Sequence, residues 1–405
     1  MTGIAMGLAL VASILSGGAI AAETPCRPAF EHGRAEVALP LHPLSVVQLN
    51  HSCVALVALS DDGDPAKGGI AILPLGGDKL RVSSTFDLAT QPVGMSVTRD
   101  ESIVAVAGIS RIYFLSVQAL LAGKSNALLG TAEYDKSAGT VSVATTPDEH
   151  LLFASDEDAR TVTVLDFAAA RKSGFTKVPV LGRVPVDNAP TVLVMARDGE
   201  HVFLPVERVL RALHPPITCA SEGNPGGPPV NASGAILVIG VAAALAAPQN
   251  AVLSRTYAGC FPVRMALSLN GRTAWVTNRL GDAVRTMDVE KILDGNKAAQ
   301  IGIASTGPTP IGVAPVDDDR LVLVSNSDRW AHDRAPETLS LFAVSPARSR
   351  LTTLGTIRVG SFPRDIAVAP DGRTVFVSNF GSNSLTLLDV KKLRQMARPT
   401  TPPSR

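Results

Sequence analysis

The chain has 405 residues, of which 46% are hydrophobic and 18% charged, and its formal net charge is +1. This composition excludes a chain dominated by disorder, because it offers ample apolar surface for burial. The near-zero charge gives no field that would favour nucleic acid or an anionic membrane surface as a partner. Aromatic residues make up only 4%, so the core must be built from Val, Leu, Ile and Ala, which suits closely stacked sheets.

The first segment, 1–21, has the features of a secretory signal. An apolar stretch runs from Ile4 to Ile20 and ends in the small-x-small site Ala19-Ile20-Ala21, a pattern typical of cleavage near Ala21. No Lys or Arg precedes the stretch, so an uncleaved anchor stays open as the alternative, although the run is weakly hydrophobic for a span of about 20 residues. We therefore expect a signal peptide, a periplasmic or secreted mature protein, and no membrane span after cleavage.

One pattern recurs along the rest of the chain. A β-rich run leads to an Asp or Asn turn residue, a second run follows and ends in FASD, WVTN, LVSN or FVSN in the clearest copies, and a polar loop precedes a third run. Five of the six spacings between copies lie near 50 residues and the sixth is 72 residues, which indicates a propeller with one four-stranded blade per repeat. The turn residues are Asn50, Asp100, Asp148, Asp198, Asn270, Asp318 and Asp371.

The last copy, FPRDIAVAPDGRTVFVSNFGSNSLTLLDV, resembles the YVTN β-propeller repeat, a WD40-like family that is also grouped with lactonase-like propellers. The resemblance covers nearly the whole mature chain and is strongest in the copies that turn at Asn270 and Asp371. It implies an all-β fold, a seven-bladed β-propeller with four-stranded antiparallel blades. It also implies one activity, the hydrolysis of a sugar lactone.

The last copy lacks a fourth strand. After its third β-rich run only KKLRQMARPTTPPSR remains, whereas GRAEVALPL at 33–41 precedes the first complete copy. We expect this N-terminal strand to close the last blade as its outer strand, because closure removes open sheet edges. The predicted propeller spans 22–395, with an insertion at 207–234 in blade four and a disordered tail at 396–405.

The alternation of antiparallel strands sorts the connections onto two faces. Turns between first and second strands lie on one face, which we name the turn face; second-to-third loops and blade-to-blade loops lie on the other, which we name the loop face. Cys26 and Cys53 fall on the turn face of the neighbouring blades seven and one, and Cys219 and Cys260 on the loop face of blades four and five. We therefore predict the disulfides Cys26–Cys53 and Cys219–Cys260, each contributing about 2–4 kcal/mol in an oxidising compartment; free buried thiols are the alternative.

Charged residues stand at the start of two inner strands, where the family favours Gly. They are Arg264 in blade five and Asp365 in blade seven, and Arg364 precedes the latter. Since propellers usually bind at the mouth of the central channel, these residues predict an anion or polar-substrate site there; solvated residues paired with neighbouring blades are the alternative. Trp330, in the long loop at 327–338, is a candidate for a binding lip on the same face.

The sequence offers no catalytic constellation. It contains no CxxC, GxSxG, P-loop or HExxH motif, so we expect no metal and no cofactor. We favour an exported, monomeric binding protein whose partner is a protein or a small polar ligand, without nucleic acid. The alternative is the lactone hydrolase, which needs a base and oxyanion donors at the channel mouth, where the candidates are Arg264, Arg364 and Asp365. An electron-transfer subunit would need cofactor ligands that the sequence lacks.

Overall fold

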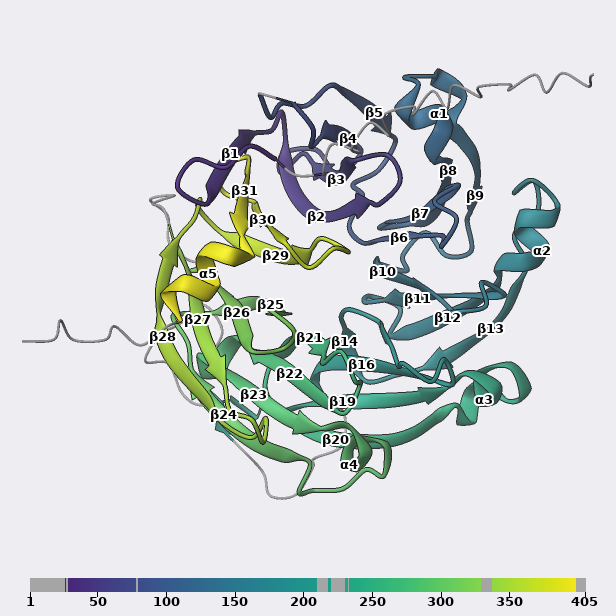
Figure 1. The fold of residues 1–405 in the computed structure, drawn as a ribbon. Coiled ribbons are helices and arrows are strands. Elements are labelled where there is room, and N and C mark those ends of the chain that lie inside the picture. Colours follow the sequence, from purple (N-terminus) through teal and green to yellow (C-terminus); the bar gives the residue numbers. More distant parts are fainter. Residues whose placement is uncertain are drawn as a thin grey trace, which may run out of the picture.

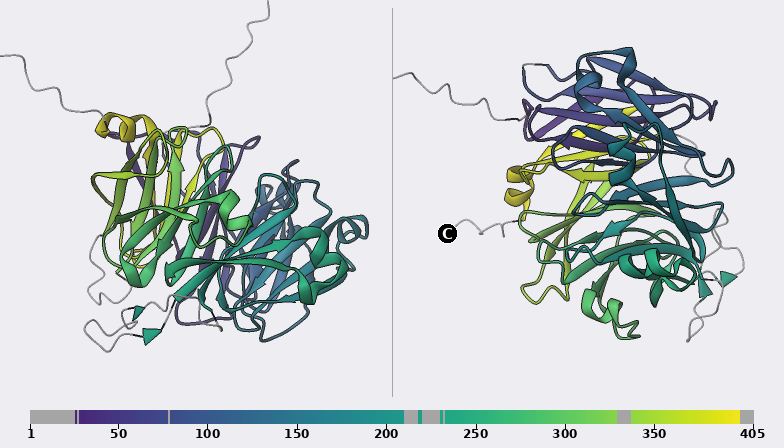
Figure 2. Two further views of the ribbon diagram at one scale, coloured as in Figure 1. Left: turned by 90° about the horizontal axis from the view of Figure 1, so that it is seen from below. Right: turned by 90° about the vertical axis from the view of Figure 1, so that its right-hand side faces the viewer.

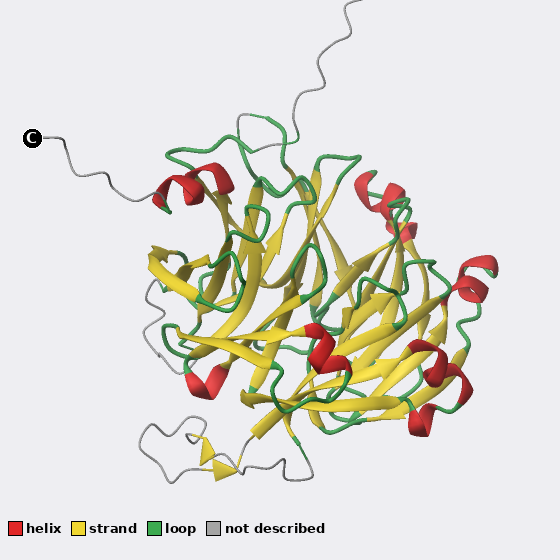
Figure 3. Ribbon diagram, turned by 60° about the horizontal axis from the view of Figure 1, so that its bottom comes forward, coloured by secondary structure: helices red, strands yellow, loops and turns green. Residues whose placement is uncertain are grey.

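The computed structural model describes residues 26, 28–77, 79–209, 218–219, 230–231, 233–328 and 337–397. These residues form seven sheets around a common centre, together with a separate short hairpin of β17 (Thr218–Cys219) and β18 (Val230–Asn231). The chain colours run once around the ring (Figure 1), so successive sheets follow one another in sequence. Figures 2 and 3 show the ring from other sides, with the β17–β18 hairpin standing outside it. The predicted signal at 1–21 lies outside the described residues.

The first four blades are antiparallel sheets whose strands follow chain order from the inner edge to the outer edge. Blade one has β2 (His42–Leu49), β3 (Val54–Ser60), β4 (Gly68–Pro74) and β5 (Ser84–Leu88). Blade two has β6 (Met95–Val97), β7 (Ile103–Gly108), β8 (Arg111–Ser116) and β9 (Leu128–Ala132). Blade three has β10 (Thr140–Thr145), β11 (Leu151–Asp156), β12 (Thr161–Asp166) and β13 (Val180–Pro185). Blade four has β14 (Asn188–Pro190) and β15 (Val194–Met195), then β16 (His201–Arg208), β19 (Ser233–Gly240) and β20 (Val252–Cys260).

The last three blades repeat the arrangement. Blade five has β21 (Pro262–Leu267), β22 (Thr273–Asn278), β23 (Ala283–Asp288) and β24 (Gln300–Ser305). Blade six has β25 (Pro310–Val316), β26 (Leu321–Asn326), β27 (Thr338–Val344) and β28 (Leu351–Arg358). Blade seven has β29 (Pro363–Val368), β30 (Thr374–Asn379) and β31 (Ser384–Asp389), and its outer strand is β1 (Arg34–Ala38). The predicted seven-bladed fold is confirmed.

The ring closes as the sequence predicted. Strand β1 pairs antiparallel with β31, with Arg34 opposite Leu388 and Ala38 opposite Ser384, and Figure 1 shows the purple β1 beside the yellow β31. Both predicted disulfides are present, Cys26–Cys53 and Cys219–Cys260. Within the described part of the chain, no helix has both the length and the apolar character that a membrane crossing needs.

Short helices follow the third strands of five blades. An Asp at the end of the third strand caps three of them, because its carboxylate accepts a backbone N–H of the first turn. Asp166 accepts from Ala169 at 2.8 Å, and Asp389 accepts from Lys391 at 2.9 Å. The Asp-Val pair of the repeat therefore ends a strand and starts a helix. The helices are α1 (Val117–Leu121), α2 (Phe167–Lys172), α3 (Val241–Ala246), α4 (Val289–Leu293) and α5 (Val390–Met396).

Blade four differs from the four-stranded prediction in its inner strand. The strand is in two pieces, β14 and β15, which both pair with β16, and the residues between them, 191–193, face the central channel. At this break Thr191 still bonds to the partner strand: its backbone N–H and its hydroxyl both donate to the carbonyl of Pro205, at 3.1 and 3.0 Å. Helix α5 reaches Met396, one residue into the predicted tail, and 398–405 lie outside the described residues.

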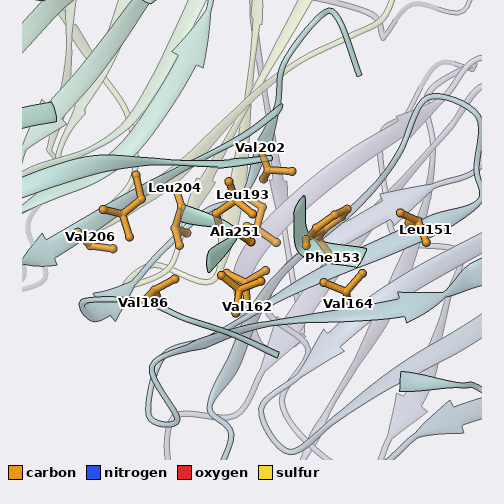
Figure 4. Packing of buried hydrophobic residues seen from close by; sticks show 14 of the residues in the cluster. Leu151, Phe153, Val162, Val164, Val186, Leu193, Val202, Leu204, Val206 and Ala251 are labelled. Atoms are coloured by element: carbon orange, nitrogen blue, oxygen red, sulfur yellow. The ribbon is translucent and has the colours of Figure 1, made fainter. Parts of the chain in front are cut away.

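The core lies between the blades and consists of aliphatic side chains. Figure 4 shows side chains of β11 and β12 in blade three, including Phe153 and Val162, facing Val202 and Leu204 of β16 in blade four. Each of these four side chains is fully buried. Because both faces of a blade are covered, the second strands read as continuous apolar runs rather than alternating ones.

The Ser or Thr in the repeated strand ends ties neighbouring blades together. The hydroxyl of Ser155 donates to the carbonyl of Thr191 at 2.5 Å, and that of Thr277 donates to the carbonyl of Ile311 at 2.6 Å. In each pair the acceptor belongs to the inner strand segment of the next blade. These fully buried hydroxyls are therefore satisfied and hold the channel lining in place.

On the turn face, carboxylates link three pairs of neighbouring blades. In three blades the residue that follows the turn residue is acidic and has a positive φ. These residues are Glu101 (51°), Glu149 (56°) and Asp319 (62°). Each of these side chains accepts a backbone N–H from the preceding blade, which compensates for a backbone conformation that costs a non-glycine residue free energy. The bonds run from Asn50 and His51 to Glu101 at 2.5 and 3.0 Å, from Arg99 to Glu149, and from Leu269 to Asp319 at 2.8 Å.

The junction between blades three and four lacks this link, and the sequence explains why. The donor position is Pro147, which has no N–H, and the acceptor position is Gly199, with φ of 71°. A Cβ at Gly199 would lie 3.1 Å from Cγ of Pro147, so the two turns pack directly against each other. A carboxylate here would have no backbone N–H to accept.

The link between blades two and three is testable at Glu149. We expect Glu149→Ala to lower the free energy of unfolding by about 1–3 kcal/mol, because it removes the acceptor for Arg99 and the ion pair with Arg171, 3.0 Å away. Glu149→Gly loses the same carboxylate but relaxes the positive φ, so it should recover about 1 kcal/mol of that loss. Urea unfolding of both variants measures the effect, and equal stability of Glu149→Ala and the parent would contradict the link.

Candidate functional site

The inner strands enclose a cavity of about 210 Å³ in the central channel. Its lining comes from the beginnings of inner strands in blades one to five and seven, which is the loop-face end because blade-to-blade connections arrive there. The charged residues of this lining are Arg264, Arg364 and Asp365. The structure thus brings together the three charged residues for which the sequence predicted a site at the channel mouth, although they come from blades five and seven.

A β-bulge sets the direction of these side chains. The pairing register shifts between Pro262 and Arg264 in blade five, and between Pro363 and Asp365 in blade seven. One extra residue at each point interrupts the ladder and re-aims its neighbours. In blade seven the extra residue is Arg364, so two consecutive charged residues both line the channel.

Aromatic rings hold Arg364 in place. Its guanidinium carbon lies 5.3 Å from the centre of the Phe380 ring and 5.5 Å from that of Phe362. His42 of blade one stacks on Phe380 with a centroid separation of 4.6 Å, and its Nδ1 lies 2.6 Å from the Phe380 carbonyl oxygen. This cation–π arrangement fixes a cation at the boundary between the last blade and the first.

Asp365 is a half-buried carboxyl that lines the same cavity as Arg264 and Arg364. Burial raises the pKa of Asp365 above its ordinary value, while Arg264, the backbone N–H groups of Val46 and Ile366, and Arg364 oppose the shift. Arg264 is half-buried and donates from Nη1 to the carbonyl of Val263 at 2.9 Å. The channel therefore holds an acid whose protonation depends on two nearby fixed cations.

Two further charged residues belong to this mouth, and the sequence analysis did not nominate them. Glu157 follows β11 and its side chain is exposed; partial desolvation and the neighbouring Asp158 raise the pKa of Glu157, while Arg279, Arg264 and Arg364 oppose that shift. Arg279 is only 8% exposed, lies 3.2 Å from the carboxylate of Glu207 and sits 5.5 Å from the centre of the Phe261 ring. The repeat could have revealed both, since each directly follows a strand-end Asp or Asn, as Phe380 does.

The Cys219–Cys260 disulfide lies beside the mouth. Cys219 and Phe261 form a small buried cluster that Cys260 and Leu280 flank. Arg208, at the end of β16, places its guanidinium carbon 4.7 Å from the centre of the same Phe261 ring. The bridge therefore anchors Cys219, near the middle of the predicted insertion at 207–234, beside a ring that two arginines contact. Trp330, the predicted lip residue, lies outside the described residues.

The arrangement suits recognition of an anion. Arginine guanidinium groups match carboxylate and phosphate oxygens with two parallel hydrogen bonds, and they remain charged at any ordinary pH. Within the described residues no group of three or more His, Cys, Asp or Glu side chains is placed to hold a metal ion.

Fold and site together define a seven-bladed β-propeller with a charged channel mouth on its loop face. Residues 254–400 match the family described as "Lactonase, 7-bladed beta-propeller", which confirms the predicted resemblance to lactonase-like propellers. The match covers blades five to seven, where the repeat is clearest. No curated protein matches the sequence significantly.

Solved structures share the fold at low sequence identity. The periplasmic gluconolactonase of Pseudomonas aeruginosa superposes with a TM-score of 0.60 at 18% identity, over 83% of this chain and 91% of that one. A 6-phosphogluconolactonase homologue from Bacteroides fragilis gives 0.59 at 12% identity, over 82% and 89%. A chain of the mitotic checkpoint complex gives 0.62 at 11% identity, over 95% and 99%. Such different neighbours establish the fold, and function has to come from the site.

The coupling between Arg264 and Asp365 is testable by titration. Since Arg264 opposes the upward shift, we expect Arg264→Ala to raise the pKa of Asp365 further, so that the carboxyl stays protonated to a higher pH. Carboxyl carbon NMR, with Asp365→Asn for assignment, measures the pKa. Arg197→Ala, at the turn-face end of the channel, is the matched control. An unchanged or lower pKa in Arg264→Ala would show that the two groups do not interact.

Proposed function

We propose that this protein is an extracytoplasmic binding propeller that takes a small carboxylate-bearing ligand at the loop-face mouth of its channel. The observation that carries the proposal is the convergence of Arg264 and Arg364 on one cavity of about 210 Å³. A cavity of this size admits a small molecule or the end of one. The two guanidinium groups come from different blades, so a single carboxylate could engage both.

Hydroxyl groups around the same cavity favour a hydroxylated ligand. Ser45 donates to the carbonyl of Val93 at 2.5 Å, and Thr191 donates to that of Pro205 at 3.0 Å. Ser45 and Thr191 line this cavity, and a hydroxyl oxygen that donates one hydrogen bond can still accept another. We therefore propose a hydroxycarboxylate, such as a sugar acid, as the ligand class.

Export is part of the proposal. Two disulfides are typical of proteins in oxidising compartments, and one neighbour in fold is described as periplasmic. Together with the signal-like segment 1–21, these features support a periplasmic or secreted protein.

Hydrolysis of a sugar lactone is the second candidate, favoured by the position of Asp365 in the same cavity as two arginines and by the family match over 254–400. Water would add to the ring carbonyl as Asp365 accepts its proton, and Arg264 and Arg364 would stabilise the oxyanion. The ring C–O bond then breaks, the ring oxygen takes up a proton, and a hydroxycarboxylate is the product. Both candidates therefore place the same class of molecule in the same cavity.

Binding of gluconate, measured by isothermal titration calorimetry, tests the first candidate. We expect Arg264→Ala and Arg364→Ala each to weaken binding by about tenfold or more, because each removes a charge-assisted hydrogen bond. Asp365→Asn should bind as well as the parent or more tightly, since it removes a like charge. Arg197→Ala serves as the control. Failure of the parent to bind gluconate or a related hydroxycarboxylate would refute the proposal.

The rate of glucono-lactone hydrolysis, followed in a pH-stat, separates the two candidates. A binding protein leaves the spontaneous rate unchanged. A hydrolase accelerates it, and Asp365→Asn abolishes the acceleration while gluconate binding persists. That result would favour lactone hydrolysis over binding as the function of this protein.

A further inference from the structure

A second cavity, of about 840 Å³, lies on the turn face between blades three and four. Its walls are the turn at 146–151, the turn at 197–201 and helix α3, which belongs to blade four. It is therefore at the opposite face from the channel mouth. It also lies at the junction where Pro147 and Gly199 replace the carboxylate link.

The neighbouring junction shows what occupies the corresponding space. Between blades two and three, Arg171 of α2 reaches across the gap. Its guanidinium pairs with Asp100, with Ser102 Oγ at 3.1 Å and with Glu149 at 3.0 Å. A cation thus fills the space between two turns, held by the turn residue of one blade and the turn of the next.

The junction between blades six and seven uses the same device. Arg394 is the fifth residue of α5, as Arg171 is of α2, and it pairs with Asp317 in the turn of blade six. In both helices the first and fourth residues are buried. The fifth position therefore points a side chain toward the turn of the preceding blade.

Between blades three and four the arginine is replaced, and one of its acceptors, the carboxylate of the turn residue, remains as Asp148. The fifth residue of α3 is Leu245, which is 46% exposed and lines the cavity. Asp148 and His150 stand where Asp100 and Ser102 stand one blade earlier. The carboxylates of Asp198 and Glu200 join the lining from blade four. The pocket keeps the carboxylate of Asp148, gains those of Asp198 and Glu200, and lacks the arginine that occupies this position in α2 and α5.

The charge and polarity of the residues that line this cavity indicate the class of ligand that it binds. Hydrogen bonds from Thr146 and the His150 backbone lower the pKa of Asp148, so its carboxylate is ionised at neutral pH. Burial raises the pKa of Asp198, but hydrogen bonds from His201 and Glu200 outweigh it and lower the pKa. Arg197 is the fixed cation in this lining. Leu245 and Leu253, 46% and 53% exposed, supply an apolar wall.

We infer that this cavity binds a small organic cation, a guanidinium group on an aliphatic chain. The guanidinium takes the place that Arg171 holds one junction earlier and pairs with Asp148 and the carboxylates of blade four. The aliphatic chain lies against Leu245 and Leu253, the apolar wall of the cavity. A volume of about 840 Å³ accommodates a ligand of this size.

Titration of the full mature protein with n-butylguanidinium tests the inference by calorimetry. One molar equivalent should bind, more tightly than guanidinium alone, and butyrate should not bind at this site. Asp148→Asn should weaken binding by about tenfold, since it removes a charged acceptor. Leu245→Arg should abolish binding, because the guanidinium of the new arginine would occupy the place of the ligand's guanidinium.

Leu245→Arg has an independent readout. Its new guanidinium should pair with Asp148 as Arg171 pairs with Asp100, so the midpoint of thermal unfolding should rise without ligand. The matched control is Leu121→Arg, which adds the same charge at the fifth position of α1, outside the cavity. That control should leave binding of n-butylguanidinium unchanged.

Three results would overturn the inference. The first is absence of n-butylguanidinium binding to the parent. The second is unchanged binding in Leu245→Arg or Asp148→Asn. The third is preferential binding of butyrate that Arg197→Ala removes, which would make this an anion site.

Discussion

The pairing of β1 with β31 is the interaction on which the rest of the structure depends. It gives blade seven its fourth strand and removes the open edge that β31 would otherwise present. It also ties blade one to blade seven, and the channel mouth is built across that boundary. Asp365 accepts the backbone N–H of Val46, and His42 stacks on the ring that faces Arg364. Ring closure and site formation are thus one event.

Some positions of the repeat stabilise the fold in every blade, and others carry the side chains of the candidate sites. The strand-end hydroxyls and the capping Asp residues recur because every blade needs them. The residue after the strand end varies, and it places Glu157, Arg279 and Phe380 around one mouth. The fifth helix position varies too, between an arginine that links blades and Leu245, which leaves a cavity. Both sites that we propose lie where an otherwise regular repeat departs from its pattern.

The sequence predicted the fold well because its signals are local. Turn residues, β-rich runs and a period near 50 residues place each strand, and strand alternation then assigns each cysteine to a face. It predicted less where several blades meet. The inner strand of blade four is in two pieces, at the point where its partner strand presents Pro205, which has no backbone N–H to donate. The sequence analysis did not predict Glu157 as part of the channel mouth, since the three arginines that act on its carboxylate come from blades five and seven.

By itself, the sequence determined the number of blades, the closing strand, the disulfide pairs and the three charged residues at the channel. Each of these follows from spacing along the chain or from the order of strands. Only the tertiary structure decided that Arg264, Arg364 and Asp365 share one cavity, and that Leu245 leaves another unfilled. The physical reason is that charge, burial and void volume depend on side chains that converge from separate blades, and such distances are not encoded in any single repeat.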